Sequence, residues 1–217
     1  MNAKEILSRV DHTILKPEAT WEDVRKLCDE AMEANTASVC INPCFVKRAA
    51  DYMKGKIAVC TVVGFPLGAS ATEIKVAETK KAIEDGCDEI DMVINVGELK
   101  AKNYDYVREE IVAVKQAAGS KVVKVIIEAC LLTDEEKEKM CELVFEGGAD
   151  YIKTSTGFSS GGATYEDVAL MKRCVNGRYK IKAAGGINSR EALEKFIELG
   201  ADRIGSSRAI KLLGDMQ

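Results

Sequence analysis

Aromatic residues, histidine and proline are scarce in this sequence, and long hydrophobic runs are absent. The 217 residues include 6% aromatic residues, three prolines and a single histidine, His12. No stretch comes near the roughly 20 apolar residues that a membrane-spanning helix needs, and residues 1–10 lack the apolar segment of a secretory signal. We therefore expect a cytoplasmic protein with no membrane partner.

The sequence also lacks an excess of positive charge. It contains 31 lysines and arginines against 35 aspartates and glutamates, which gives a net charge of -4. Nucleic-acid-binding domains usually carry a basic excess or a basic stripe. We therefore expect no nucleic-acid partner, although small anionic ligands are compatible with positive charge that is concentrated locally.

The eight cysteines contain no CxxC pair and are scattered through apolar segments. In a chain without a secretory signal, such cysteines are typical of reduced thiols rather than of a disulfide framework. A single histidine leaves no Cys/His zinc set. We therefore expect neither a structural metal nor a bound cofactor.

Short runs rich in valine and isoleucine alternate with longer helical patterns along the whole chain, and this alternation predicts a parallel sheet covered by helices. The predicted strands lie at 10–15, 37–41, 57–62, 89–93, 122–127, 151–153, 179–183 and 203–205. Eight strands favour an α/β fold of the (β/α)8 TIM-barrel type, with one domain over residues 1–217 and a short N-terminal helix. The alternative is an open doubly wound sheet, but its G-x-G-x-x-G fingerprint is absent.

Polar residues mark the predicted helix ends. Four predicted helix starts carry a capping pair, in which a short polar residue is followed three residues later by an acid. The pairs are Thr20 with Asp23, Ser70 with Glu73, Thr133 with Glu136, and Asn188 with Glu191. Left-handed caps are predicted at Asn35, Gly86, Gly148 and Gly200. The fifth residue after each of these caps is Cys40, Asp91, Lys153 or Gly205. These four lie on alternate strands, so we expect them to form one layer near the barrel mouth.

Two lysines stand in strand patterns that should be buried. Lys153 ends the sixth strand and precedes the hydroxyl- and glycine-rich residues 154–157, and Lys182 precedes Gly185 and Gly186 in a similar way. A buried lysine must be paired, hydrated in a pocket, or neutral and reactive. Lys153 is therefore a candidate amine nucleophile.

An ordinary lysine is protonated at neutral pH and is a weak nucleophile. A nearby positive charge disfavours the ammonium form, so the sequence predicts that Lys182 activates Lys153 by repulsion. Asp91 would keep Lys182 charged and relay protons through water. The alternative is a buried ion-pair cluster that only packs the barrel.

The last two strands are followed by Gly185 and Gly186, and by Gly205, Ser206 and Ser207. Backbone amides in these loops can hold a phosphate, although a tight turn also requires glycine. Asp11 and Thr13 could bind sugar hydroxyls or simply form a strand-end turn. Cys40 is expected at the mouth, where reactive aldehydes could alkylate it. Lys124 and Glu128 share a strand face, and a structural pair inside the barrel is predicted.

The residues together resemble the deoxyribose-phosphate aldolase family. The similar segments are DHT at 11–13, EIDMVIN at 89–95, VKVIIE at 123–128, DYIKTSTGF at 150–158, KAAGGI at 182–187 and RIG at 203–205. This resemblance implies a class I aldolase, without metal or cofactor, that reversibly cleaves 2-deoxy-D-ribose 5-phosphate to D-glyceraldehyde 3-phosphate and acetaldehyde in deoxyribonucleotide catabolism.

The resemblance also implies residue roles. Lys153 would form the Schiff base, Asp91 and Lys182 would transfer protons, and the phosphate would contact Gly157, Gly185, Gly186, Gly205 and Ser206. Asn188 stands where many members have arginine, and either Arg208 supplies that charge or it is a solvated surface residue. The partners would be a small phosphorylated sugar and aldehydes, and a homo-oligomer, a dimer or larger, is compatible with the sequence.

Two other functions remain open from the residues alone. A phosphosugar isomerase or epimerase of the same barrel type would keep the phosphate loops, but it would need carboxylate bases and would form no imine. A non-catalytic regulator would bind a phosphometabolite without turnover. Reductive trapping of an imine separates the aldolase from both.

Overall fold

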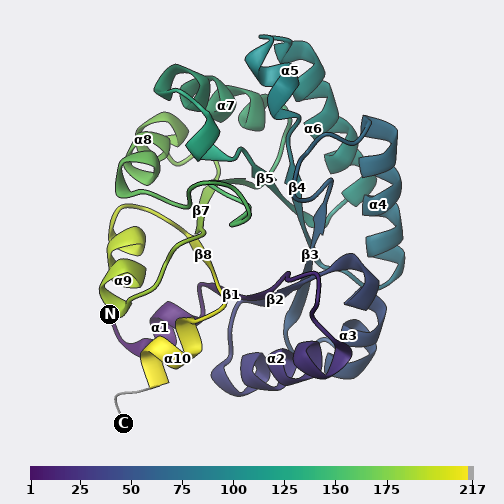
Figure 1. The fold of residues 1–217 in the computed structure, drawn as a ribbon, viewed down its shortest axis with the longest axis vertical. Coiled ribbons are helices and arrows are strands. Elements are labelled where there is room, and N and C mark those ends of the chain that lie inside the picture. Colours follow the sequence, from purple (N-terminus) through teal and green to yellow (C-terminus); the bar gives the residue numbers. More distant parts are fainter. Residues whose placement is uncertain (215–217) are drawn as a thin grey trace.

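Eight parallel strands close into a barrel in the computed structural model, which describes residues 1–214 (Figure 1). The strands follow each other around the barrel in chain order: β1 (Val10–Ile14), β2 (Ser38–Ile41), β3 (Ala58–Val63), β4 (Glu89–Val93), β5 (Val122–Ile126), β6 (Tyr151–Lys153), β7 (Lys180–Ala184) and β8 (Arg203–Ser206). β8 pairs with β1, with Gly205 opposite Asp11. The predicted (β/α)8 barrel is therefore confirmed, and the open sheet is excluded.

Helices surround the strands on all sides (Figure 1). They are α1 (Ala3–Leu7), α2 (Trp21–Ala34), α3 (Val46–Met53), α4 (Thr72–Glu84), α5 (Val96–Lys100), α6 (Tyr104–Ala118), α7 (Asp134–Glu146), α8 (Tyr165–Val175), α9 (Arg190–Glu198) and α10 (Ala209–Gly214), with short 3-10 turns at Pro43–Phe45 and Ala129–Leu131. Within residues 1–214, none of these helices is long and apolar enough to cross a membrane.

The apolar core lies between the outer faces of the strands and the surrounding helices. Ile90, Val123 and Ile152 are fully buried there, on the strand positions next to Asp91, Lys124 and Lys153. Because side chains alternate along a strand, the neighbouring polar positions point into the barrel. The helices therefore pack on an apolar surface, while the barrel interior is left for charged groups.

The strand register agrees with the predicted layer of Cys40, Asp91, Lys153 and Gly205. These four residues lie on even-numbered strands, and each stands opposite a residue on an odd-numbered strand. Cys40 is opposite Cys60, Asp91 is opposite Lys124, Lys153 is opposite Lys182, and Gly205 is opposite Asp11. Two sets of four residues from alternate strands therefore meet inside the barrel, and Gly205 is the one position among them without a side chain. This arrangement concentrates lysines and carboxylates in a space that is almost entirely shielded from solvent.

Helix ends follow the sequence signals at most positions. Thr20 and Thr133 form the predicted capping boxes, and Asn35, Gly86, Gly148 and Gly200 have the predicted positive φ angles. Two predicted caps are wrong. α4 begins after Ala71, so Glu73 stands too early to complete a box with Ser70. Ser189, not Asn188, caps α9, and the Asn188 side chain accepts a hydrogen bond from Arg208.

The aspartates that follow three of these helix ends make a repeated contact. Asp88, Asp150 and Asp202 each precede a strand, and their Oδ2 atoms accept hydrogen bonds from the backbone N–H groups of Val59, Val123 and Ile181 on the preceding strand. The distances are 3.1, 2.8 and 2.9 Å. Each aspartate thus ties two neighbouring strands together at the amino-terminal end of the barrel.

Candidate active site

A cavity of about 740 Å³ opens at the carboxyl ends of the strands. Lys153 lines it together with Thr156, Gly157 and Phe158 from the loop that follows β6. Residues 184–188 after β7 and residues 205–208 at the end of β8 form another part of its wall. The strand-end lysine and both glycine-rich loops therefore face one space, as the sequence predicts for a (β/α)8 active site.

Lys153, Lys182 and Asp91 meet at the bottom of this cavity. The Oδ2 atom of Asp91 accepts hydrogen bonds from Lys153 Nζ at 2.7 Å and from Lys182 Nζ at 2.6 Å. Lys153 is 3% exposed, and the other two residues are fully buried. β4, β6 and β7 thus supply three charged groups to a single point, with Lys153 on the side of the cavity.

Asp91 is charged despite its burial. Burial disfavours the carboxylate, but the positive charges of Lys124, Lys153 and Lys182 outweigh this penalty and hold the pKa of Asp91 well below its usual range. Burial also disfavours the ammonium of Lys182, but Asp11 and Asp91 outweigh it and raise the pKa of Lys182. At neutral pH, Asp91 is therefore an anion and Lys182 a cation.

The sequence predicts that Lys182 repels Lys153 while Asp91 keeps Lys182 charged, and the structure adds a second carboxylate to this arrangement. Lys182 contacts two carboxylates, because its Nζ lies 2.6 Å from Asp91 and 2.5 Å from Asp11. Asp91 also stands between the two amines. The effect of Lys182 on Lys153 must therefore be judged from the whole cluster of charges.

The cluster holds four basic groups and three carboxylates, so it has one basic group in excess. The basic groups are Lys124, Lys153, Lys182 and Arg203, and the carboxylates are Asp11, Glu89 and Asp91. Among residues 1–214, Lys153 has one carboxylate partner, whereas each of the other basic groups has at least two. Lys153 is also the one lysine of the cluster that lines the cavity.

Asp11 does not reach the sugar-binding position proposed for it from the sequence. It is fully buried, and its carboxylate contacts Lys182 and Arg203 and accepts a hydrogen bond from Ser38 Oγ at 2.7 Å. Strand parity correctly predicted that the Asp11 side chain points into the barrel. Asp11 lies too deep in β1, however, to line the cavity. Thr13, two residues later, does line the cavity, and its hydroxyl donates to the backbone carbonyl of Asp11 at 2.7 Å.

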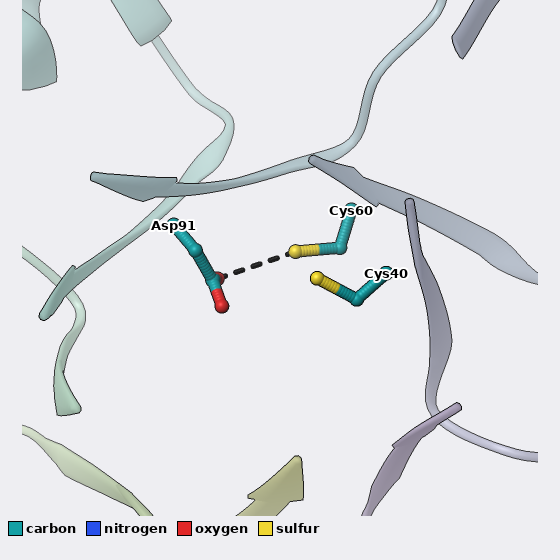
Figure 2. A group of neighbouring side chains, drawn as sticks. All are labelled: Cys40, Cys60 and Asp91. Atoms are coloured by element: carbon teal, nitrogen blue, oxygen red, sulfur yellow. Dashed lines mark hydrogen bonds between the residues drawn. The ribbon is translucent and has the colours of Figure 1, made fainter. Parts of the chain in front are cut away.

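Cys40 is not exposed at the mouth, which corrects another expectation. It is fully buried and packs with Leu15, Cys60, Val62 and Phe65 beneath the cavity. Figure 2 shows the sulfur of Cys60 directed at Asp91 and the sulfur of Cys40 beside it; the Cys60 Sγ to Asp91 Oδ1 distance is 3.2 Å. An aldehyde could reach Cys40 only after the covering side chains moved.

The donor atoms of Cys40, Cys60 and Asp91 lie within 4.8 Å of one another, which raises the question of a metal site. Lys124 Nζ already lies 2.9 Å from Asp91 Oδ1 and 3.3 Å from Cys60 Sγ. Burial raises the pKa of Cys60 well above its usual value, so this thiol keeps its proton. A divalent cation would have to displace an ammonium and a thiol proton, and the donor set does not suit it.

The candidate phosphate residues gather on one side of the cavity. Gly157, Gly185 and Gly186 all have positive φ angles, and Ser206, Ser207 and Asn188 line the same cavity. At Gly185 an added Cβ would lie 3.0 Å from the backbone of Gly162, so the close approach of two loops also requires glycine there. Arg208 lines the cavity and donates to the Asn188 side chain at 3.3 Å. This arrangement places a guanidinium beside Asn188.

Glu89, Arg203 and Phe65 belong to the site region but were not singled out from the sequence. Glu89 and Arg203 begin strands β4 and β8, and each pairs inside the barrel. A charged residue at the start of an apolar strand was the signal that could have found them. Phe65 packs edge-on against Phe158, with ring centroids 5.2 Å apart, and no sequence pattern indicates that contact.

The predicted pair between Lys124 and Glu128 is wrong. Lys124 binds carboxylates inside the barrel, whereas Glu128 has a left-handed backbone conformation, with φ of 50°, just after β5. That turn directs its carboxylate to Thr156, whose backbone N–H donates to it at 3.1 Å. Strand parity does not apply beyond the end of the strand, which is why the sequence argument failed.

Comparison with known proteins identifies the family. The model of the DeoC/LacD family of aldolases matches residues 6–210. The chain belongs to this family. It is 58% identical over 213 residues to a deoxyribose-phosphate aldolase of Clostridium botulinum (strain Alaska E43 / Type E3), with 98% of this chain and 96% of the relative covered. It is 54% identical to a deoxyribose-phosphate aldolase of Thermococcus kodakarensis, with 98% and 97% covered.

Solved structures of similar aldolases have the same fold. A putative deoxyribose-phosphate aldolase from Coccidioides immitis superposes with a TM-score of 0.96 at 39% identity, over 99% of this chain and 87% of that one. A tetrameric deoxyribose phosphate aldolase from Aeropyrum pernix gives a TM-score of 0.90 at 31% identity, over 99% and 92%. The predicted aldolase resemblance is therefore confirmed at the level of the family.

Proposed function

We propose that this chain is a class I deoxyribose-phosphate aldolase in which Lys153 forms the Schiff base. The reaction is the reversible cleavage of 2-deoxy-D-ribose 5-phosphate to D-glyceraldehyde 3-phosphate and acetaldehyde. The observation that carries this proposal is the position of Lys153 at the floor of a cavity. Among residues 1–214, Lys153 has the fewest carboxylate partners of the lysines in a cluster with one excess basic group. The names and near-complete coverage of the relatives support the choice of substrate.

The covalent steps use one amine and return it. The neutral amine of Lys153 attacks the aldehyde carbon C1, and loss of water from the carbinolamine gives a protonated imine. The C3 hydroxyl then loses its proton, the bond between C2 and C3 breaks, and its electrons pass into the imine to give an enamine and the free aldehyde product. Protonation of C2 and addition of water release acetaldehyde and the amine.

Asp91 and Lys182 are proposed to manage the protons. Asp91 Oδ2 contacts both amines, so it can stabilise the positive imine that replaces the ammonium of Lys153. Lys182 provides a proton donor on the other side of the same oxygen, and water can carry protons between this pair and the substrate. Burial shields this network from solvent, so its charged hydrogen bonds are electrostatically stronger than they would be in water.

The phosphate is proposed to bind at the exits of β7 and β8. Backbone amides of Gly157, Gly185, Gly186 and Gly205 and the Ser206 hydroxyl are the candidate donors, with Ser207, Asn188 and Arg208 beside them. Exposed backbone N–H groups bind phosphate oxygens well because they are fixed dipoles that need no reorganisation. This placement sends the sugar chain from Lys153 toward β7 and β8.

Borohydride reduction in the presence of acetaldehyde tests the proposal. The expected result is one ethyl group on Lys153, located by peptide mass spectrometry. Lys153→Leu should carry no such adduct and have no turnover, while Lys180→Leu, which changes an exposed lysine on the neighbouring strand, should keep both. An isomerase or a non-catalytic binding protein would give no adduct. Turnover in Lys153→Leu would refute the assignment of the nucleophile.

We further propose that the chain forms a homo-oligomer. The support is the tetramer named for the Aeropyrum pernix relative. Light scattering coupled to size-exclusion chromatography at micromolar concentration should give a mass at least twice that of the chain. A monomeric mass across the concentration range would contradict this proposal without affecting the chemistry.

A further inference from the structure

Glu128 is a buried carboxylate for which the proposed reaction has no use. It is 4% exposed, and it forms no ion pair among residues 1–214. The other buried carboxylates of that range each have a cationic partner; they are Asp11, Glu89, Asp91, Glu110 and Asp167. The two contacts of Glu128 are hydrogen bonds from Thr156, one from the backbone N–H at 3.1 Å and one from the hydroxyl. Neither contact brings a positive charge to this buried carboxylate, and a buried carboxylate without a cation is costly, so its retention calls for a reason.

The segment that carries Glu128 runs beside the Schiff-base lysine. The backbone N–H of Ile127 donates to the carbonyl of Lys153 at 3.0 Å, and that of Ala129 donates to the carbonyl of Thr154 at 2.8 Å. Thr156, which holds the Glu128 carboxylate, lines the main cavity with Lys153. Glu128 itself lines a second cavity of about 130 Å³, together with apolar residues that include Val93, Leu131 and Phe158. Its carboxylate therefore stands behind Thr156, which lines both cavities and lies three residues after Lys153.

Glu128 and the phosphate loops lie on opposite sides of Lys153. The barrel order places β5, which leads to Glu128, on one side of β6, and places β7 and β8 with the phosphate loops on the other. A sugar bound through C1 runs toward β7 and β8, so the C1 hydrogen points to the side of Glu128. In an imine formed from a 2-oxo acid, the carboxylate takes the place of that hydrogen and would face the charge of Glu128.

We propose that Glu128 is a specificity-determining residue that excludes anionic carbonyl donors, such as 2-oxo acids, from Lys153. This inference rests on the proposed Schiff-base function. The step it controls is condensation, in which the amine adds to the carbonyl carbon and the carbonyl oxygen leaves as water. Two like charges about 8 Å apart at an effective dielectric constant of about 20 change an equilibrium about 30-fold. A neutral donor such as acetaldehyde does not experience this repulsion.

Pyruvate and pyruvamide provide a matched pair of donors, because they have nearly the same shape and differ by one charge. The full chain is incubated with each under borohydride, and the rate of adduct formation on Lys153 is measured by mass spectrometry. The same two rates on a free lysine derivative in the same buffer give the intrinsic ratio. We expect the ratio of pyruvate to pyruvamide on the protein to be at least about tenfold below the intrinsic ratio.

Three variants separate charge from packing. Glu128→Gln keeps the size and removes the charge, and it should raise the ratio about 30-fold. Glu128→Asp keeps the charge and disturbs the contacts with Thr156, and it should leave the ratio low. Glu110→Gln is the matched control, because Glu110 is buried but is paired with Lys75 at 2.7 Å outside both cavities. It should also leave the ratio low.

Two results would overturn the inference. One is a ratio on the unaltered chain equal to the intrinsic ratio, and this comparison stands even when a variant fails to fold. The other is a ratio of pyruvate to pyruvamide that does not change in Glu128→Gln, or that rises in Glu128→Asp as much as it does in Glu128→Gln. Acetaldehyde serves as the separate control for the function itself, because absence of its adduct on the unaltered chain would refute the Schiff base rather than the selectivity.

Discussion

Replacement of Lys182 by leucine should shift the pH dependence of the reaction. The nitrogens of Lys153 and Lys182 lie 2.7 and 2.6 Å from the same oxygen of Asp91, so their separation is bounded by these two contacts. Removal of Lys182 also removes the excess basic group of the cluster. Lys153 would then be the main partner of Asp91 Oδ2, without the repulsion of a second amine at the same oxygen.

The size of the shift follows from that distance. Two unit charges about 5 Å apart at an effective dielectric constant of about 20 repel by about 3 kcal/mol, which corresponds to about two pH units. The acid limb of the kcat/KM profile should therefore move to higher pH by about two units, and activity at pH 7 should fall about a hundredfold. Initial rates of sugar phosphate cleavage from pH 5 to pH 10 measure this profile.

Lys180→Leu is the matched control, since Lys180 lies on the same strand but is exposed. Its profile should coincide with that of the unaltered chain. A profile of Lys182→Leu that keeps its midpoint and loses only amplitude would refute the charge argument. In that case the charge of Lys182 would not be what sets the pH dependence of the reaction.

Three further predictions concern the phosphate, acid stability and the base of the barrel. Arg208→Ala should raise KM for the phosphorylated sugar about tenfold while leaving kcat/KM for unphosphorylated 2-deoxyribose unchanged; an equal effect on both substrates would contradict a phosphate contact. Burial opposes the charge of Asp11, but Lys182, Lys124 and Arg203 outweigh burial and lower the pKa of Asp11. The stability that the Asp11 carboxylate contributes is therefore present above about pH 4 and is lost as pH falls. Urea unfolding from pH 5 to pH 2 should show this decline, and Asp11→Asn should flatten it. Asp150→Ala loses the bonds to Val123 N–H and Lys115, so thermal unfolding should occur several degrees lower with kcat unchanged; an unaltered unfolding temperature would count against the contact.

The fold was predictable because the signals for a (β/α)8 barrel are local and repeated. Left-handed glycines at Gly86, Gly148 and Gly200 end helices, and an aspartate and an apolar run follow each of them. The fixed spacing from these caps also put Asp91 and Lys153 on the same face of alternate strands. Strand parity and the rule that active sites lie at the carboxyl ends were sufficient for that step.

The depth and partners of the site residues were not predictable in the same way. Asp11 shares the inward parity of Thr13, yet two residues along the strand separate a buried ion pair from a cavity wall. Cys40 was expected at the mouth, but Leu15 and Phe65 from other elements cover it. Such differences depend on strand tilt and on side chains far away in the sequence, which periodicity does not contain.

The sequence by itself determined the barrel, the strand-end position of Lys153 and the family, because each depends on residue type and on spacing along the chain. Only the tertiary structure decided which charges balance one another. Within residues 1–214, the single carboxylate partner of Lys153, the two of Lys182 and the lack of a cation beside Glu128 result from strands that close into a ring. Electrostatic energy depends on distance in space, and closure of the barrel sets those distances.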